Sequence, residues 1–290
     1  MFFQHLLNGL IIGGIYAMVA LGYSMVYGVL QIVNWAHADV LMFGTFIGMI
    51  LATGLNMPVI AMVLLAACFT AILGMTVEVV AYRPIKSSNR RMAVLVSALG
   101  MSTFLQNLAQ LIFGSDTRQF KIMESKTIEL AGMKITNMQI IILSVTAAML
   151  LVLYILVYRT KLGVAMRACS VSIDNAKLMG INTNMIISGT FGVGAFMAGI
   201  AGILVGAYYN AVYPTMGYLL GMKAFAAAIL GGIGSIPGAV MGGFIIGIIE
   251  SLGAGYISSA YRDAFAFLVM ILILIIRPSG LMGAKHIDKV

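Results

Sequence analysis

Long apolar runs alternate with short polar connections along the whole chain, and none of these runs shows the alternation typical of a strand. Backbone groups in lipid must be hydrogen-bonded within the segment itself, so runs of this length are expected to be membrane helices. The eight runs cover residues 6–29, 40–53, 59–80, 92–113, 138–158, 185–207, 223–250 and 258–276. The pattern predicts an all-α, polytopic membrane bundle that forms a single domain over residues 1–290.

One of these runs carries residues that disfavour a continuous helix. The sequence GGIGSIPGAVMGG, at 231–243, puts many glycines and a proline in the middle of an apolar stretch. We expect the chain to break there, to turn back within the membrane and to leave by the side it entered, and the segment 31–54 could be broken in the same way. Backbone groups released by such a break could line or gate a solute pathway. The candidate residues are Gly231, Gly232, Gly234, Ser235, Pro237 and Gly238. The alternative is close helix packing through small residues, which Gly242, Gly243 and Gly247 would also suit.

Composition and charge place the whole chain in the membrane. Hydrophobic residues make up 61% of it, charged residues 9%, and the mean hydropathy is +1.05, whereas ordinary soluble domains are about 25% charged. The net charge of +8 comes from short basic clusters between the apolar runs, so it indicates membrane topology and no nucleic-acid partner. The basic connections at 82–91 and 159–184 are therefore expected in the cytoplasm.

The connection at 114–137 is then expected outside the cytoplasm, because two apolar runs separate the basic connections. Within it, residues 127–130 and 133–136 alternate around Ala131 and Gly132, which predicts a small hairpin. The side on which the N-terminus lies stays open. Cys68 and Cys169 are expected in different environments, without a disulfide.

The motif NWAHADV, at 34–40, interrupts two apolar runs with Asn34, His37 and Asp39. Ionisable groups inside a membrane are costly and indicate function. His37 and Asp39 could pair, orient a turn, or contact a passing zwitterion, and the alternative is an interfacial turn anchored by Trp35. Lys223 and Glu250 are expected at the interfacial ends of their run.

The basic connection at 162–182 is too long for a simple link. Ser172 is expected to cap a short helix with Ile173, Ala176 and Met179 on one side, and Gly180 is expected to end it. Such an apolar stripe could dock in a groove on a partner, and the alternative is a helix that lies on lipid headgroups.

Motifs of enzymes are absent from the sequence. It contains no HExxH, no CxxC, no nucleophile elbow and no Gly-Lys dipeptide, so it has no Walker A phosphate loop. We expect no catalytic residue, no metal site and no cofactor bound by this chain. If ATP drives its activity, another polypeptide must bind the nucleotide.

Several ordered segments resemble the LivH-type permease subunits of branched-chain amino acid ABC importers. They are LNGLIIGGIYAMVALGYSMVYGVLQIVNWAHADV, YRPIKSSNRR with LVSALGMSTFLQN, MRACSVSIDNAKLMGIN, AAAILGGIGSIPGAVMGGFIIG and RPSGLMG. The resemblance implies a bacterial inner-membrane permease that works with a second, related permease, two cytoplasmic ATP-binding cassette subunits and a periplasmic solute-binding protein.

The resemblance also implies an ATPase-coupling role for one segment. Its residues are Arg167, Ala168, Ser172, Asp174, Ala176, Met179 and Gly180. The alternatives are an ion-coupled secondary transporter, for which Asp39 and Glu250 are the candidate carboxylates, and an ABC permease for urea, amides or aromatic acids.

Overall fold

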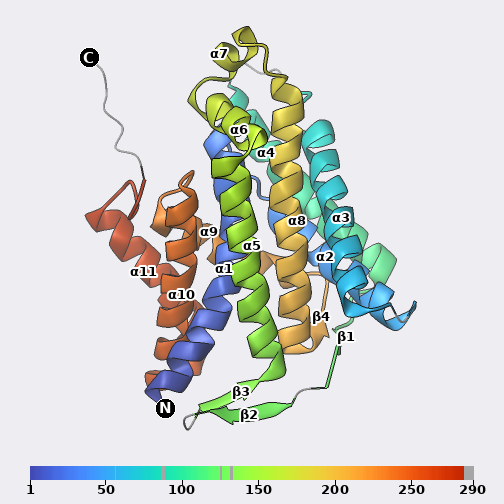
Figure 1. Cartoon of the computed structure of the whole chain (residues 1–290), viewed down its shortest axis with the longest axis vertical. Helices are drawn as coiled ribbons and strands as arrows, with labels where there is room; N and C mark the ends of the chain where they lie inside the picture. The colour runs from blue at the N-terminus through green and yellow to red at the C-terminus, as the bar shows by residue number, and fades with distance from the viewer. Residues whose placement is uncertain (56, 86–88, 125, 131–132, 284–290) are drawn as a thin grey trace.

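The computed structural model describes residues 1–55, 57–85, 89–124, 126–130 and 133–283 as a helical bundle (Figure 1). The helices are α1 (Phe2–Leu30), α2 (His37–Thr53), α3 (Val59–Val77), η1 (Glu78–Tyr82), α4 (Arg90–Phe113), α5 (Asn137–Arg159), α6 (Lys161–Val171), α7 (Ile173–Leu178), α8 (Thr183–Tyr209), α9 (Met216–Gly231), α10 (Ile236–Tyr256), η2 (Ser259–Tyr261) and α11 (Arg262–Ile276). The strands are β1 (Arg118–Gln119), β2 (Thr127–Leu130), β3 (Met133–Thr136) and β4 (Ala211–Val212). The predicted all-α membrane architecture is confirmed. In the described part of the chain, seven helices are long and apolar enough to cross a membrane, while α2 and α9 are shorter.

The polar connections gather at the two ends of the bundle, as predicted. Helices α6 and α7 lie at one end and the β2–β3 hairpin at the other (Figure 1). Arg83 Nη2 donates to Ser188 Oγ at 2.6 Å, which joins the connection after η1 to the start of α8. The two basic connections therefore share one end of the bundle.

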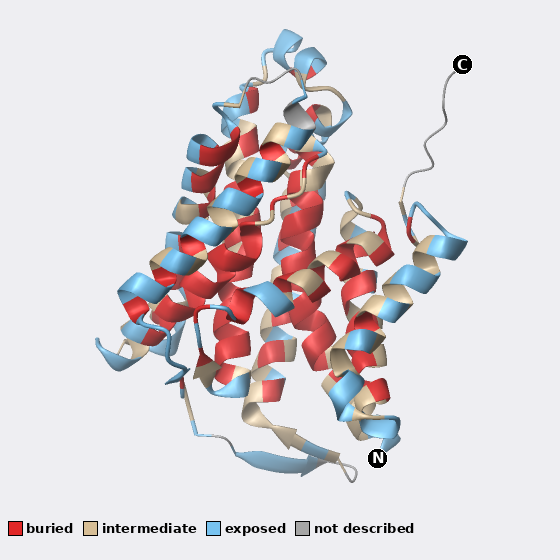
Figure 2. Ribbon diagram, turned by 180° about the vertical axis from the view of Figure 1, so that it is seen from behind, coloured by how far each residue is buried: buried red, intermediate tan, exposed pale blue. Residues whose placement is uncertain are grey.

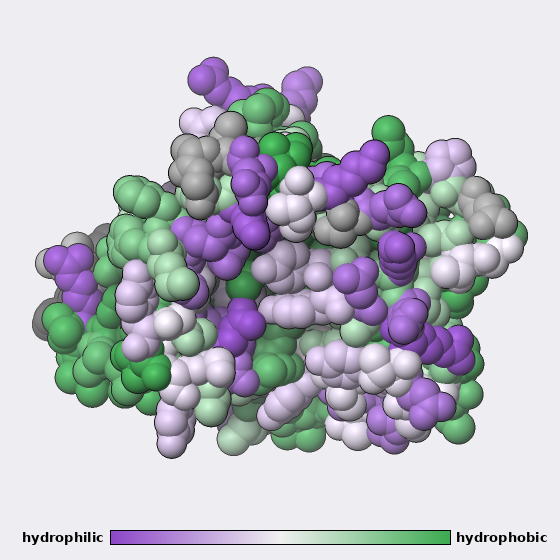
Figure 3. All heavy atoms as spheres, turned by 90° about the horizontal axis from the view of Figure 1, so that it is seen from below, coloured by the Kyte–Doolittle hydropathy of each residue, from purple (hydrophilic) through white to green (hydrophobic). Residues whose placement is uncertain are grey.

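The N-terminus lies at the opposite end, beside the hairpin. Gln4 Nε2 donates to the Lys134 carbonyl at 3.0 Å, and Lys134 N donates to Gln4 Oε1 at 2.9 Å. Strands β2 and β3 pair antiparallel, with Thr127 opposite Thr136, which confirms the predicted hairpin strands, although Ala131 and Gly132 lie outside the described residues. Polar and charged side chains spread across this end, with hydrophobic side chains towards its rim (Figure 3).

Helices α1 and α8 form the centre of the bundle, and buried residues concentrate there (Figure 2). The most apolar 18-residue windows of α1 and α8 are 94% and 89% buried, against 22% for α4 and α5. Small residues bring α1 against α10: a Cβ on Gly13 would lie 2.8 Å from the Cα of Phe244, and one on Gly243 would lie 2.5 Å from the Ala17 nitrogen. Part of the glycine-rich segment thus serves close helix packing, the alternative raised from the sequence.

The apolar run at 223–250 is broken, as predicted, but at the end of the bundle and not within it. Helix α9 ends at Gly231 and α10 begins at Ile236, with Pro237 in its first turn. Gly232 and Gly234 have φ angles of 101° and 91°, which other residues rarely adopt. Gly234 packs beside Gly28, near the last turn of α1. The turn therefore lies at the end of the bundle that carries α6, where Gly234 and Ile236 border the same cavity as Met166 and Arg167.

The interruptions within the bundle precede α2 and α9 instead. After α1, the chain runs back without helical structure until α2 begins at His37, beside Gly22 of α1. The chain likewise passes from β4 into the bundle before α9 begins at Met216. A Cβ on Gly221 would meet Ala38, so the two short helices begin side by side. The chain is interrupted within 31–54, as suggested, but α2 runs on to the end that carries β1 and β4, where a Cβ on Gly48 would lie 3.8 Å from Phe120, so the suggested return to the side of entry is wrong.

Candidate functional site

The three polar residues of the NWAHADV motif are buried inside the bundle. Asn34, His37 and Asp39 have relative exposures of 4%, 2% and 1%. The ring of Trp35 packs against Phe225 of α9 with centroids 5.4 Å apart. The alternative of an interfacial turn is therefore wrong, because these side chains face other helices.

Asn34 and His37 hold the start of α2 against its neighbours. Tyr82 Oη donates to Asn34 Oδ1 at 2.6 Å, which ties the irregular segment to η1. The His37 ring occupies the space that a side chain on Gly22 would need, and it meets the Tyr23 ring edge-on at 4.8 Å. Both contacts fix where α2 begins.

Only one of the two carboxylate oxygens of Asp39 accepts a hydrogen bond of full geometry from the described residues. Gln106 Nε2, on α4, donates to Asp39 Oδ1 at 3.0 Å. Within the described part of the chain, Asp39 Oδ2 and His37 Nε2 are buried and make no hydrogen bond of full geometry, although the Ser102 hydroxyl lies close to the Asp39 carboxylate. These two atoms therefore do not join the side chains as a pair.

A cavity of about 340 Å³ lies beside Asp39. Its walls include Tyr23 from α1, Ser102 and Gln106 from α4, and Tyr218 from α9, together with Trp35. Sequence reasoning missed Ser102 and Gln106, although their spacing of four residues in an apolar run places two polar side chains on one helix face. The cavity thus combines a carboxylate, an amide, hydroxyl groups and aromatic rings.

A second buried charge cluster lies on the other side of α9. Glu250 is 0% exposed and accepts from Tyr16 Oη at 2.8 Å, Lys223 Nζ at 3.0 Å and Arg262 Nε at 2.6 Å. Lys223 is also 2.5 Å from Asp263. The expectation that Lys223 and Glu250 lie at interfacial ends is wrong, because they pair inside the bundle, where a cavity of about 400 Å³ adjoins Lys223.

The glycine-rich turn does not join the Asp39 site. Ser235 Oγ accepts from Gly238 N at 3.2 Å and so caps α10. The carbonyls of Leu230 and Gly231 accept from Leu281 N and Met282 N, each at 2.9 Å. The segment after α11 therefore uses two of the carbonyls that a break would release, and the structure separates the two predicted pathway clusters.

The connection between α5 and α8 forms two short helices, of which only α7 was predicted. Ser172 Oγ accepts from Asn175 N at 3.2 Å, and Gly180, with φ of 80°, follows the helix, so the predicted start and stop are confirmed. Ala176 is 3% exposed and Met179 is 83% exposed. The predicted partner-facing stripe is therefore wrong for Ala176, because that side of α7 packs against the rest of the protein.

The other coupling candidates differ in accessibility. Arg167 donates to the Val157 carbonyl and lies over the Tyr158 ring, so its guanidinium is held by α5. Ala168 is half-buried, while Asp174 is exposed and 3.6 Å from Lys177. In α6, burial raises the pKa of the Cys169 thiol. Cys68 and Cys169 are both free, as expected.

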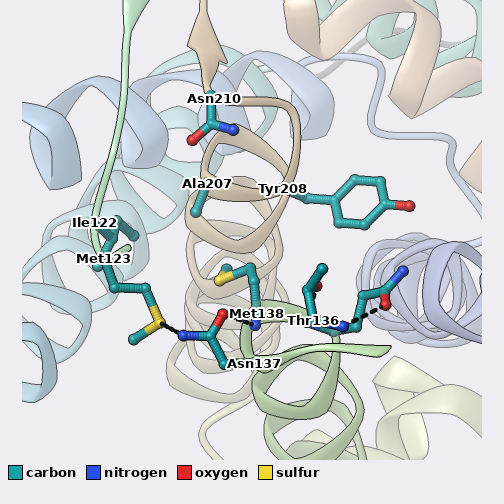
Figure 4. A pocket seen from close by; sticks show the side chains of 9 residues that line it. Ile122, Met123, Thr136, Asn137, Met138, Ala207, Tyr208 and Asn210 are labelled. Atoms are coloured by element: carbon teal, nitrogen blue, oxygen red, sulfur yellow. Dashed lines mark hydrogen bonds between the residues drawn. The ribbon is translucent and has the colours of Figure 1, made fainter. Parts of the chain in front are cut away.

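The opposite end carries a pocket of about 350 Å³ between the start of α5 and the end of α8 (Figure 4). Asn137 lines it, and its Nδ2 donates to Met123 Sδ at 3.5 Å while its Oδ1 accepts from Met138 N at 2.9 Å. Tyr208 and Asn210 line it from the end of α8. The pocket opens beside the hairpin, and Tyr209, the next residue after Tyr208, borders the cavity beside Lys223.

Comparison with known proteins decides the family. Residues 5–274 match the model of the branched-chain amino acid transport system permease component. The chain belongs to this family. The permease is 41% identical to the high-affinity branched-chain amino acid transport system permease protein LivH of Escherichia coli (strain K12), over 100% of this chain and 98% of that protein. It is also 41% identical to BraD of Pseudomonas aeruginosa over the same shares.

More distant relatives agree with the assignment. A probable LivH of Methanocaldococcus jannaschii is 29% identical over 96% of this chain and 92% of that protein. The solved structure of PsaBC from Streptococcus pneumoniae in complex with Fab shares the fold, with a TM-score of 0.51 at 16% identity over 96% of this chain and 93% of that chain. The permease is thus a multi-pass integral membrane protein of a transport family, and that family is not one of enzymes.

Proposed function

We propose that this permease is one of two related subunits that together form the translocation pathway of an ABC importer for branched-chain amino acids. The observation that carries the proposal is the buried, half-satisfied carboxylate of Asp39 beside a cavity, at the place where two short helices begin within the bundle. Transporters bind solutes at such interrupted helices. The relatives' names supply the solute class.

The energy would come from two separate ATP-binding cassette subunits. The chain lacks a phosphate loop, whereas α7 projects at the basic end of the bundle (Figure 1). Val171, Leu178 and Met179 are 87%, 85% and 83% exposed there. We assign this end to the cytoplasm by its positive charge and these three side chains to the ATPase contact.

The opposite end would face the solute-binding protein. It carries the β2–β3 hairpin and the pocket beside Asn137, both at the polar end seen in Figure 3. ATP binding on the cytoplasmic side would then shift the permease pair between outward-facing and inward-facing states.

The test is reconstitution of the permease with its second permease, the ATPases and the solute-binding protein in vesicles. Leucine uptake is expected with ATP and expected to stop when the phosphate-loop lysine of the ATPases is replaced. Uptake that continues without any ATPase would refute the proposal in favour of an ion-coupled transporter. Uptake of urea, amides or aromatic acids in preference to leucine would refute the solute class.

A further inference from the structure

Asp39 carries a buried carboxylate whose hydrogen-bond donors among the described residues, Gln106 and Ser102, are both neutral. Asp39 is 1% exposed; Gln106 donates to Oδ1, the Ser102 hydroxyl lies close to the carboxylate, and Oδ2 makes no hydrogen bond of full geometry within the described part of the chain. A buried ionised group is strongly destabilising unless it is paired. Asp39 also lies in the first turn of α2, where the helix dipole favours a negative charge. The helix dipole thus supports an ionised Asp39, but among the described residues no Lys, Arg or His pairs with it as a positively charged partner.

The cavity beside Asp39 has the chemistry to take such a partner. Among the described residues that line it, none is Lys, Arg or His. The rings of Tyr23, Trp35 and Tyr218 contribute to its walls, and aromatic faces attract ammonium groups. Leu99 and Met222 add apolar surface that an aliphatic side chain could contact.

The size and accessibility of the cavity also suit a small solute. Its volume of about 340 Å³ falls within the range of roughly 300–1,000 Å³ that is common for small-molecule sites. Leu99 and Tyr218 are 47% and 57% exposed, so the cavity reaches the surface between α4 and α9.

We propose that this cavity binds the primary ammonium group of an α-amino acid, with Asp39 Oδ2 as its acceptor and the rings of Trp35 and Tyr218 as its walls. This inference rests on the proposed function and adds the contact that recognises the amino group. Asp39 then gains in the loaded state the partner that it lacks in the empty state.

Trp35 allows a direct test because it is the only tryptophan in the chain and lines the cavity. Its fluorescence is measured in the purified full-length chain in lipid nanodiscs. The ligands are leucine, isoamylamine, which keeps the ammonium but lacks the carboxylate, and 4-methyl-2-oxopentanoate, which lacks the ammonium. Each is titrated to about 50 mM, above the millimolar Kd expected of a transient site.

Leucine and isoamylamine are expected to change the Trp35 fluorescence in a saturable way. The oxoacid is expected to leave the fluorescence unchanged. Asp39→Asn keeps the shape of the side chain and removes its charge, so it should raise the Kd of leucine and of isoamylamine about tenfold or more. Tyr218→Leu, at an exposed position, should weaken the binding of both amines without unfolding the chain. Tyr213→Leu changes a tyrosine that borders the other cavity, beside Lys223, and should bind like the wild type.

Equal responses to leucine and to the oxoacid would overturn the inference. So would wild-type binding by Asp39→Asn, which would mean that Asp39 is a permanently protonated structural residue. Uptake measured in the reconstituted importer separates the two proposals. ATP-driven leucine uptake without an ammonium-dependent signal refutes this inference alone, whereas uptake without ATPases refutes the proposed function.

Discussion

The buried carboxylate of Glu250 should be among the most important single side chains for the stability of the bundle. It accepts hydrogen bonds from Tyr16 on α1, Lys223 on α9 and Arg262 on α11, while its own backbone belongs to α10. Glu250→Leu removes the common acceptor of three donors from three helices. The change leaves Lys223 with Asp263 as its remaining carboxylate.

The expected loss in the free energy of unfolding follows from these contacts. Removing one partner of a buried ion pair costs about 3–5 kcal/mol, and the remaining Lys223–Asp263 contact puts the expectation near the lower value, about 3 kcal/mol. For a chain of this size, that corresponds to a fall in Tm of about 6–12 °C. Lys223→Met should cost less, about 1–2 kcal/mol, because Glu250 keeps two donors.

The measurement is thermal unfolding of the detergent-purified chain, followed by circular dichroism. In the double variant of Lys223→Met with Glu250→Leu, the loss should be smaller than the sum of the single losses by about 1–3 kcal/mol, because the two side chains are in contact. Asp263→Asn serves as the control, since its half-exposed carboxylate should contribute under about 1 kcal/mol. Strictly additive losses, or a wild-type Tm for Glu250→Leu, would refute the reasoning.

Three further changes test the coupling surface and the backbone. Leu178→Arg, at a position 85% exposed, should abolish co-purification of the ATPases and leave the Tm of the permease unchanged. Ala176→Arg, at a position 3% exposed, should lower the Tm. If the Leu178→Arg variant still binds the ATPases, the contact lies elsewhere. Gly13→Leu should lower the free energy of unfolding by more than the about 1–3 kcal/mol typical of overpacking, because its Cβ would lie 2.8 Å from the backbone of α10. A wild-type Tm for this variant would refute the close packing. Gly234→Ala, at φ 91°, should cost about 1–2 kcal/mol in thermal unfolding. Gly189→Ala, with open space around it, is the control, and equal effects would count against backbone strain.

The positions of most helices could be predicted because lipid imposes the same requirement on every span. An apolar run must hydrogen-bond its own backbone, so the hydropathy pattern marks α1, α3, α4, α5, α8 and α11 within a few residues. Local capping chemistry added boundaries, such as Ser172 before α7. The break between α9 and α10 was predicted, but the start of α9 at Met216 was missed, because the predicted apolar run began only at residue 223.

The contacts that join distant segments could not be predicted. Lys223 and Glu250 are 27 residues apart, and only the packing of α9 against α10 and α1 brings them together. From the sequence alone, each looked like a charge at the end of a span. Ala176 illustrates a different ambiguity, because an apolar stripe on a short helix does not reveal whether it faces the protein or a partner.

The two buried carboxylates on either side of α9 differ in a way that favours Asp39 as the site for the amino group. An ammonium that bound to Glu250 would compete with the Tyr16 hydroxyl and with two cations already within 3.0 Å. An ammonium that bound to Asp39 Oδ2 would share the carboxylate with the neutral donors Gln106 and Ser102 and would compete with no cation among the described residues that line the cavity. Neighbouring positions on α9 serve the two environments, since Met222 lines the Asp39 cavity and Lys223 pairs with Glu250. The paired carboxylate therefore holds α9 in place, and the unpaired carboxylate is the one with a coordination position left for a solute.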